Sequence, residues 1–146
     1  VHIAVLPEPM VTIARAANPD LTVALDLTAE WDKVAPAGSL VQGCVVVRKA
    51  FADEHPNEVK AFLTEYQASI EYLTAEPDQA GQMIEDAGIF AKAAVAAKAI
   101  PNCNVCFVSG ADMQAALTEF LTALSTVAPQ SIGGEVPGDD FYCILK

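Results

Sequence analysis

Basic side chains are scarce in this sequence. Lys and Arg together number 8, against 19 Asp and Glu, so the formal net charge is −11 at pH 7 over 146 residues. Nucleic acids and anionic membrane surfaces are themselves negatively charged and would repel such a chain. We therefore expect no nucleic-acid partner. The sequence also has no apolar run that approaches the roughly 20 residues needed to cross a bilayer.

Familiar catalytic and cofactor motifs are also absent from the sequence. It contains no nucleophile elbow, Walker loop or dinucleotide-binding fingerprint, and its glycine-rich run, SIGGEVPGDD, follows a predicted helix rather than a strand. Its two histidines, His2 and His55, are far apart and lack metal-ligand spacing. We therefore predict no enzymatic activity, no catalytic residue, no metal site and no cofactor.

Cysteine is limited to Cys44, Cys103, Cys106 and Cys143. An apolar chain of this length does not need a disulfide scaffold, so we expect buried free thiols, although pairing of two of them stays open. Cys103 and Cys106 have C-x-x-C spacing, but a redox pair of this kind opens a helix. Here the pair lies in CNVCFV, before the predicted helix, and we assign it neither a redox nor a metal role.

The sequence does contain a switch from strand-like to helical patterns. Strands are predicted for three apolar segments: residues 2–6, 21–26 and 41–47. Apolar positions at three- and four-residue steps predict one helix between the first two strands, at about 10–17, and four later ones: 56–74, 77–87, 91–99 and 110–127. A strand–helix–strand unit followed by helices predicts an α/β fold.

Three strands are too few for a sheet that covers so many helices. We therefore expect further strands upstream of Val1, in a larger protein of which this chain is a part. We also expect the chain by itself to expose apolar surface that the remainder would cover.

The turn after the first predicted strand is one candidate for ligand binding. It contains Glu8, Pro9 and Met10, and α/β folds bind ligands beyond the carboxyl ends of their strands. The N–H groups at the following helix start can hold an anionic or polar group, and Glu8 can instead accept from a ligand amine. The alternative is a tight connection in which Glu8 only stabilises a helix N-terminus.

A polar interruption of the third predicted strand is the other candidate. It contains Gln42, Gly43 and Cys44 within LVQGCVVV. A buried glutamine must find hydrogen bonds, and a glycine lets another backbone or a ligand approach closely. The alternative is a strand bulge without function. Trp31, the single tryptophan, suits a core or a cleft equally well.

Five stretches together resemble a known family: VHIAVLPEPMVTIARA, LTVALDL, GSLVQGCVVVRKAFADEHPNEVKAFLTEYQASIEYL, IPNCNVCF and SIGGEVPGDDFY. Their order is similar to that in the later half of the solute-binding proteins of ABC importers, in the group that takes up nitrate, sulfonates, taurine and thiamine-precursor pyrimidines. The most telling features are the proline-containing turn, the run VVVR, and the helix entered by EHP and continued by EVKAFL. Met10 departs from the aromatic that many members carry near Pro9.

The resemblance implies a two-lobe fold of the type II periplasmic-binding-protein kind, closing on its ligand by a hinge. Residues 1–39 would be the end of the second lobe, 40–47 a strand crossing the hinge, and 48–146 the later part of the first lobe. The missing N-terminal half of the same protein would complete both lobes. Glu8, Pro9 and Met10 would line the cleft from one side, and Gln42, Gly43 and Cys44 from the hinge.

The same resemblance implies capture of a small organic solute or anion for delivery to the membrane subunits of an ABC permease. It implies an extracellular or periplasmic protein, anchored as a lipoprotein through its missing N-terminus. Two other functions stay open: an enzyme of the same fold in thiamine-pyrimidine synthesis, and a ligand-sensing module.

Overall fold

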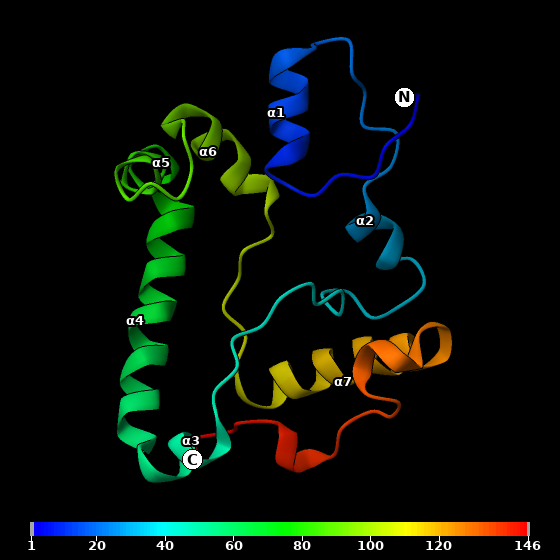
Figure 1. Ribbon diagram of the computed structural model, residues 1–146, viewed down its shortest axis with the longest axis vertical. Coiled ribbons are helices and arrows are strands. Elements are labelled where there is room, and N and C mark those ends of the chain that lie inside the picture. Colours follow the sequence, from blue (N-terminus) through cyan, green and yellow to red (C-terminus); the bar gives the residue numbers. More distant parts are fainter. Residues whose placement is uncertain (1, 146) are drawn as a thin grey trace. The chain divides into compact units, whose positions relative to one another are not determined.

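A computed structural model describes residues 2–145, and this part of the chain is helical (Figure 1). Helices account for 58% of the chain, and neither a strand nor a sheet occurs between residues 2 and 145. The prediction of an α/β fold is therefore wrong, and so is the prediction of a type II periplasmic-binding-protein-like architecture.

The helices predicted from apolar periodicity are confirmed, to within about two residues at most of their ends. They are α1 (Met10–Ala17), α4 (Pro56–Ala75), α5 (Pro77–Asp86), α6 (Ala93–Ala99) and α7 (Gly110–Val127). Pro77 begins α5 at a first-turn position, where the missing N–H of proline is no loss. Ser109 is the N-cap residue of α7, a position that serine favours, but its side chain makes no capping hydrogen bond.

The remaining helical segments are short. They are α2 (Leu27–Trp31), α3 (Lys49–Glu54) and the 3₁₀ turns η1 (Ile100–Asn102), η2 (Pro129–Ile132) and η3 (Asp139–Phe141). A membrane crossing needs a helix that is both long and strongly apolar, and residues 2–145 contain none.

The three predicted strands are non-helical segments that form no ladder within residues 2–145. Apolar, β-branched sequence favours a backbone that can join a sheet, but the sheet itself needs a neighbouring strand to take up the N–H and C=O groups. The three segments do not supply such partners to one another. The prediction of strands at residues 2–6, 21–26 and 41–47 is therefore wrong.

The same segments leave large apolar side chains in solvent. Ile3 is 88% exposed, Val23 55% and Val46 78%. The expectation that this chain exposes apolar surface is confirmed, since uncovered side chains of this size are concentrated in the segments that were predicted to be strands.

The chain forms two compact units, each made of two stretches of sequence, and one of the three points at which the chain passes between them falls within α4. The first unit comprises the residues up to Val23 together with Phe62–Phe107, and the second comprises Ala24–Ala61 together with the residues from Val108 onward. The predicted division into parts of two lobes stays a prediction.

The packing of α5 along α6 organises the first unit (Figure 1). The carboxylate of Glu85, near the end of α5, accepts the N–H of Ala93 at the start of α6. Small or aliphatic side chains fill the contact between these helices and their surroundings: Ile70, Ala80, Ala96, Ala99 and Ile100 are all buried. Because most of these side chains are alanine, the two backbones can approach closely.

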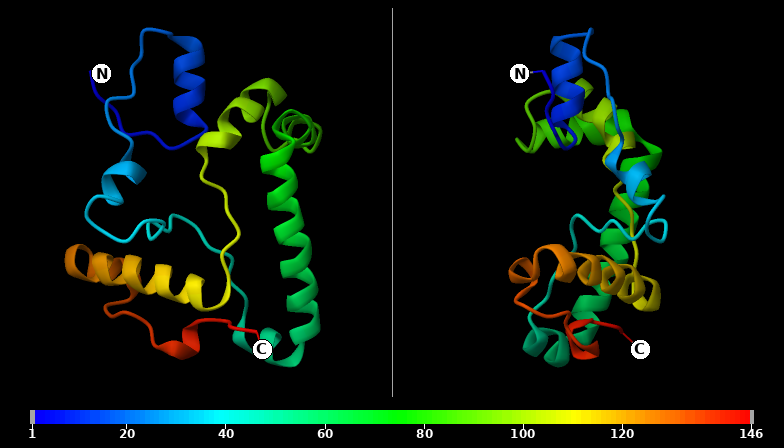
Figure 2. Two further views of the ribbon diagram at one scale, coloured as in Figure 1. Left: turned by 180° about the vertical axis from the view of Figure 1, so that it is seen from behind. Right: turned by 90° about the vertical axis from the view of Figure 1, so that its right-hand side faces the viewer.

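In the second unit, the residues after α7 turn back along that helix (Figure 2). The hydroxyls of Thr118 and Tyr142 are 2.9 Å apart, and the side-chain amide of Gln114 donates to Asp139 Oδ1 at 2.8 Å. Tyr142 is buried. The predicted apolar stripe of α7 is half-buried throughout: Met113, Leu117, Phe120, Leu121 and Leu124.

Gly81 tests the close approach of α5 and α6. A Cβ added there would lie 2.6 Å from the carbonyl oxygen of Ala93 and 3.1 Å from the Cβ of Ala97. We expect Gly81→Ala to lower the free energy of unfolding by about 1–2 kcal/mol, because an overpacking cost of about 1–3 kcal/mol exceeds a helix-propensity gain of about 0.5–1 kcal/mol. Urea unfolding followed by circular dichroism measures the change.

Gly138→Ala is the matched control. The nearest atom to its added Cβ is Asp140 Oδ1, at an ordinary contact distance of 3.5 Å. Its free energy of unfolding should stay within about 0.5 kcal/mol of the unmodified chain. A Gly81→Ala variant as stable as this control would show that the two helices are farther apart than described here.

Candidate functional site

The candidate site begins with a helix cap. The Asp26 carboxylate oxygen Oδ1 accepts the N–H groups of Thr28 at 2.9 Å and Ala29 at 3.2 Å, which starts α2 at Leu27. Aspartate is among the best N-cap residues, because its oxygen satisfies N–H groups that the first turn leaves unpaired. The chain therefore enters a helix at the position where the predicted second strand was to end.

Four side chains in α2 and the turn after it are spaced as on one face of a helix. Leu27, Glu30, Trp31 and Val34 are three and four residues apart, which places them along one side of the turn. The N–H of Val34 donates to the carbonyl of Trp31 at 2.9 Å, so the chain keeps turning after α2 ends. This side of α2 is the wall of a hollow.

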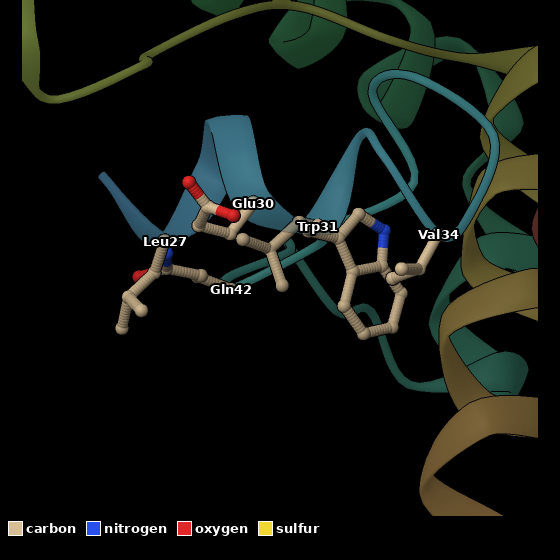
Figure 3. A pocket seen from close by; sticks show the side chains of 6 residues that line it. Leu27, Glu30, Trp31, Val34 and Gln42 are labelled. Carbon is tan, nitrogen blue, oxygen red and sulfur yellow. The ribbon is translucent and has the colours of Figure 1, made fainter. Parts of the chain in front are cut away.

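The residues that line the hollow all belong to the second unit, and Figure 3 draws their side chains. The volume of the hollow is about 560 Å³, and it is lined by Leu27, Glu30, Trp31, Val34, Leu40 and Gln42. Small-molecule sites are typically about 300–1,000 Å³, mostly apolar, with a few polar groups that set orientation. The hollow matches that description in volume and in its mostly apolar lining, with the Glu30 carboxylate and the Gln42 amide as its polar groups. It is open to solvent, since Leu27 is 54% and Val34 83% exposed.

Trp31 is fixed in place by two neighbours. Its indole Nε1–H donates to Ser39 Oγ at 2.8 Å, and the Ser39 hydroxyl donates in turn to the carbonyl of Pro36 at 2.6 Å. Ser39, the residue that links the two hydrogen bonds, is only 2% exposed, so its hydroxyl is shielded from water. The Phe120 ring on α7 makes an edge contact with Trp31, with 5.8 Å between centroids.

Glu30 carries the charge at the hollow. Its Oε1 is 2.7 Å from Lys33 Nζ, and the two side chains are 41% and 64% exposed. An ion pair this exposed contributes only about 0–1 kcal/mol to stability. The carboxylate can therefore exchange Lys33 for another cation at small cost.

Of the predicted ligand-binding residues, Gln42 lines the hollow. Gly43 and Cys44 follow it in the same non-helical segment and are exposed, with open space around the Cα of Gly43. Gln42 was expected in a buried strand, and that strand is absent. Gln42 is nevertheless at a site with room for a ligand.

Glu8, Pro9 and Met10 lie at the start of α1, in the first unit. Glu8 Oε2 accepts the N–H of Thr12 at 3.1 Å, so its carboxylate helps to satisfy the first turn of that helix. This is the structural alternative considered for Glu8. That the two predicted stretches meet at one ligand stays a prediction, as does a ligand role for Pro9 and Met10.

The cysteines are free thiols, but none of the four is fully buried, so the expectation of buried thiols is wrong. Cys44, Cys106 and Cys143 are exposed, and Cys103 is half-buried. Burial raises the pKa of the Cys103 thiol, and the negative charge of Glu8 raises it further. Across residues 2–145 no three His, Cys, Asp or Glu side chains gather into a metal-binding group.

No family model, no curated protein and no solved structure matches this chain.

Sequence reasoning missed most of the hollow. Residues 28–39 have no strong periodicity and contain Pro36 and Gly38, which is typical of a loop. The signal that could have found α2 is an N-cap aspartate, Asp26, followed by side chains at steps of three, four and seven residues from Leu27. Ser39 carries no such signal, because its hydrogen bond to Trp31 depends on how the loop folds back.

Replacing Ser39 tests the anchoring of Trp31. Ser39→Ala removes the acceptor of the indole N–H, and we expect the free energy of unfolding to fall by about 0.5–1.5 kcal/mol. Trp31 is the single tryptophan, so its fluorescence reports on this site alone, and its emission should move to longer wavelength as the ring meets more water. Ser131→Ala, which removes an exposed hydrogen bond to the carbonyl of Ala128, is the control and should change neither quantity. Unchanged emission in Ser39→Ala would contradict the anchoring.

The Cys103 thiol gives a test in the first unit. Glu8→Gln removes a negative charge that disfavours the thiolate, so the pKa of Cys103 should fall, though burial still holds it above the ordinary thiol value. Iodoacetamide alkylates the thiolate, so the alkylation rate of Cys103 rises with pH, and mass spectrometry of the Cys103 peptide follows it. In Glu8→Gln the midpoint of this rise should lie at lower pH. Glu65→Gln, an exposed carboxylate on α4, should leave the midpoint in place. An unshifted midpoint in Glu8→Gln would show that the two side chains do not interact.

Proposed function

We propose that this chain is a solute-binding component of an ABC importer and captures a small organic solute without breaking a bond. The observation that carries the proposal is that Gln42, predicted as a ligand residue from the sequence, lines a mostly apolar hollow of about 560 Å³ together with Trp31. A rigid aromatic wall and a few polar groups are what reversible binding of a small molecule requires.

The anchoring of Trp31 supports binding in a second way. A ring already held by Ser39 and Phe120 loses little conformational freedom when a solute packs against it. Preorganised sites bind more tightly because less ordering accompanies association.

The importer context rests on the resemblance of the sequence motifs. It includes an extracellular or periplasmic location, a lipoprotein anchor, and delivery to the membrane subunits of a permease. Closure by a hinge between two lobes is not part of the proposal, because the fold that implied it is not observed.

Native mass spectrometry of the purified chain tests the proposal. We expect a single small organic molecule to remain bound to a fraction of the chain. Gln42→Ala should retain about 3- to 10-fold less of it, since the loss of one or two hydrogen bonds weakens binding by about 0.5–1.5 kcal/mol.

Gln130→Ala is the control, because Gln130 is an exposed glutamine of the same unit, in η2, that does not line the hollow. It should retain the molecule as the unmodified chain does. Equal retention by Gln42→Ala and Gln130→Ala would contradict a binding role for the hollow. A chain that carries no molecule whose retention depends on Gln42 would contradict the function itself.

A further inference from the structure

The hollow offers a π face rather than a hydrogen-bond donor at Trp31. The indole N–H already donates to Ser39 Oγ at 2.8 Å, and Ser39 is buried, so a solute cannot take that proton without breaking the anchor. The Phe120 ring packs against the Trp31 ring in an edge contact. What Trp31 presents to a solute is therefore aromatic surface, which attracts apolar groups and, through its quadrupole, cations.

The electrostatics of the lining also favour a cation. Among the six described residues that line the hollow, the charged one is Glu30, and none is Lys, Arg or His. Lys33 pairs with Glu30 through an exposed contact of 2.7 Å, which a solute ammonium could replace. The chain as a whole carries −11, which raises the local concentration of cations and lowers that of anions.

We infer that the hollow takes an organic ammonium, a cation with an apolar body, held against the face of Trp31 and beside the Glu30 carboxylate. Leu27, Val34 and Leu40 contact the apolar body, and the Gln42 amide accepts from or donates to any polar group it carries. The inference rests on the proposed function, because it names the chemical class of the captured solute. It separates that class from sulfonates and nitrate, for which the one ammonium beside the hollow, that of Lys33, is already paired with the Glu30 carboxylate.

A pair of probes of equal shape tests the charge preference. Choline carries a quaternary ammonium, and 3,3-dimethyl-1-butanol is its neutral carbon analogue; methanesulfonate serves as the anion. Each is titrated into the full chain by calorimetry, with Trp31 fluorescence as a second signal. We expect choline to bind about 10-fold more tightly than 3,3-dimethyl-1-butanol, and methanesulfonate to give no measurable heat.

Substitutions of lining residues test whether the preference for a cation arises at the hollow. Glu30→Gln keeps the shape of the side chain and should weaken choline binding several-fold without affecting 3,3-dimethyl-1-butanol. Lys33→Met removes the competing ammonium and should strengthen choline binding. Trp31→Leu, with its fold checked by circular dichroism, should bring the two probes close to equal affinity.

Glu119→Gln is the matched control, since it makes the same change in net charge as Glu30→Gln at an exposed position of α7 outside the hollow. It should leave choline binding unchanged. An equal loss in both variants would assign the effect to the overall charge and overturn the inference.

The outcomes distinguish the inference from the proposed function. If 3,3-dimethyl-1-butanol or methanesulfonate binds as tightly as choline, and Gln42→Ala weakens that binding, the inference fails and solute capture stands. If no probe binds, the inference fails as well. The proposed function then fails only if native mass spectrometry also finds no molecule whose retention depends on Gln42.

Discussion

Hydrogen bonding of the main chain within helices is the constraint on which the described structure rests. A buried N–H or C=O group without a partner is costly, and a helix supplies partners from its own sequence. The long helices α4 and α7 do this over 20 and 18 residues. The apolar segments around Ile3, Val23 and Val46 cannot, and their side chains remain in solvent.

Helices α5 and α6 pack closely where their side chains are small. Gly81 on α5 lies so near Ala93 and Ala97 of α6 that not even one methyl group fits between the backbones. The carboxylate of Glu85 then reaches from α5 to the first N–H of α6. Local helix formation, close packing and capping thus support one another in the first unit, and this agreement between levels is typical of a sequence that specifies one structure.

In the second unit, the candidate site arises through a chain of short steps. Asp26 caps α2, and α2 places Leu27, Glu30 and Trp31 along one side. The loop after it folds back so that Ser39 meets the indole, and the segment beyond Ser39 brings Gln42 to the same hollow. Chemistry at this site is that of a fixed aromatic surface with one carboxylate and one amide.

The sequence by itself determined the five longer helices, α1, α4, α5, α6 and α7, to within about two residues at most of their ends, because apolar periodicity, Pro77 and similar signals act within a few residues of one another. The short helices α2 and α3 were not predicted. It also drew attention to Gln42, because a polar residue in an apolar run is visible without coordinates, but the buried strand that motivated this choice is absent and the ligand role of Gln42 stays a prediction. Tertiary structure alone decided whether residues 2–6, 21–26 and 41–47 would pair, because a strand satisfies its main chain only through a partner distant in sequence. It alone decided that Ser39 would anchor Trp31, because a hydrogen bond across a loop depends on the path of the loop and not on the spacing of the two residues.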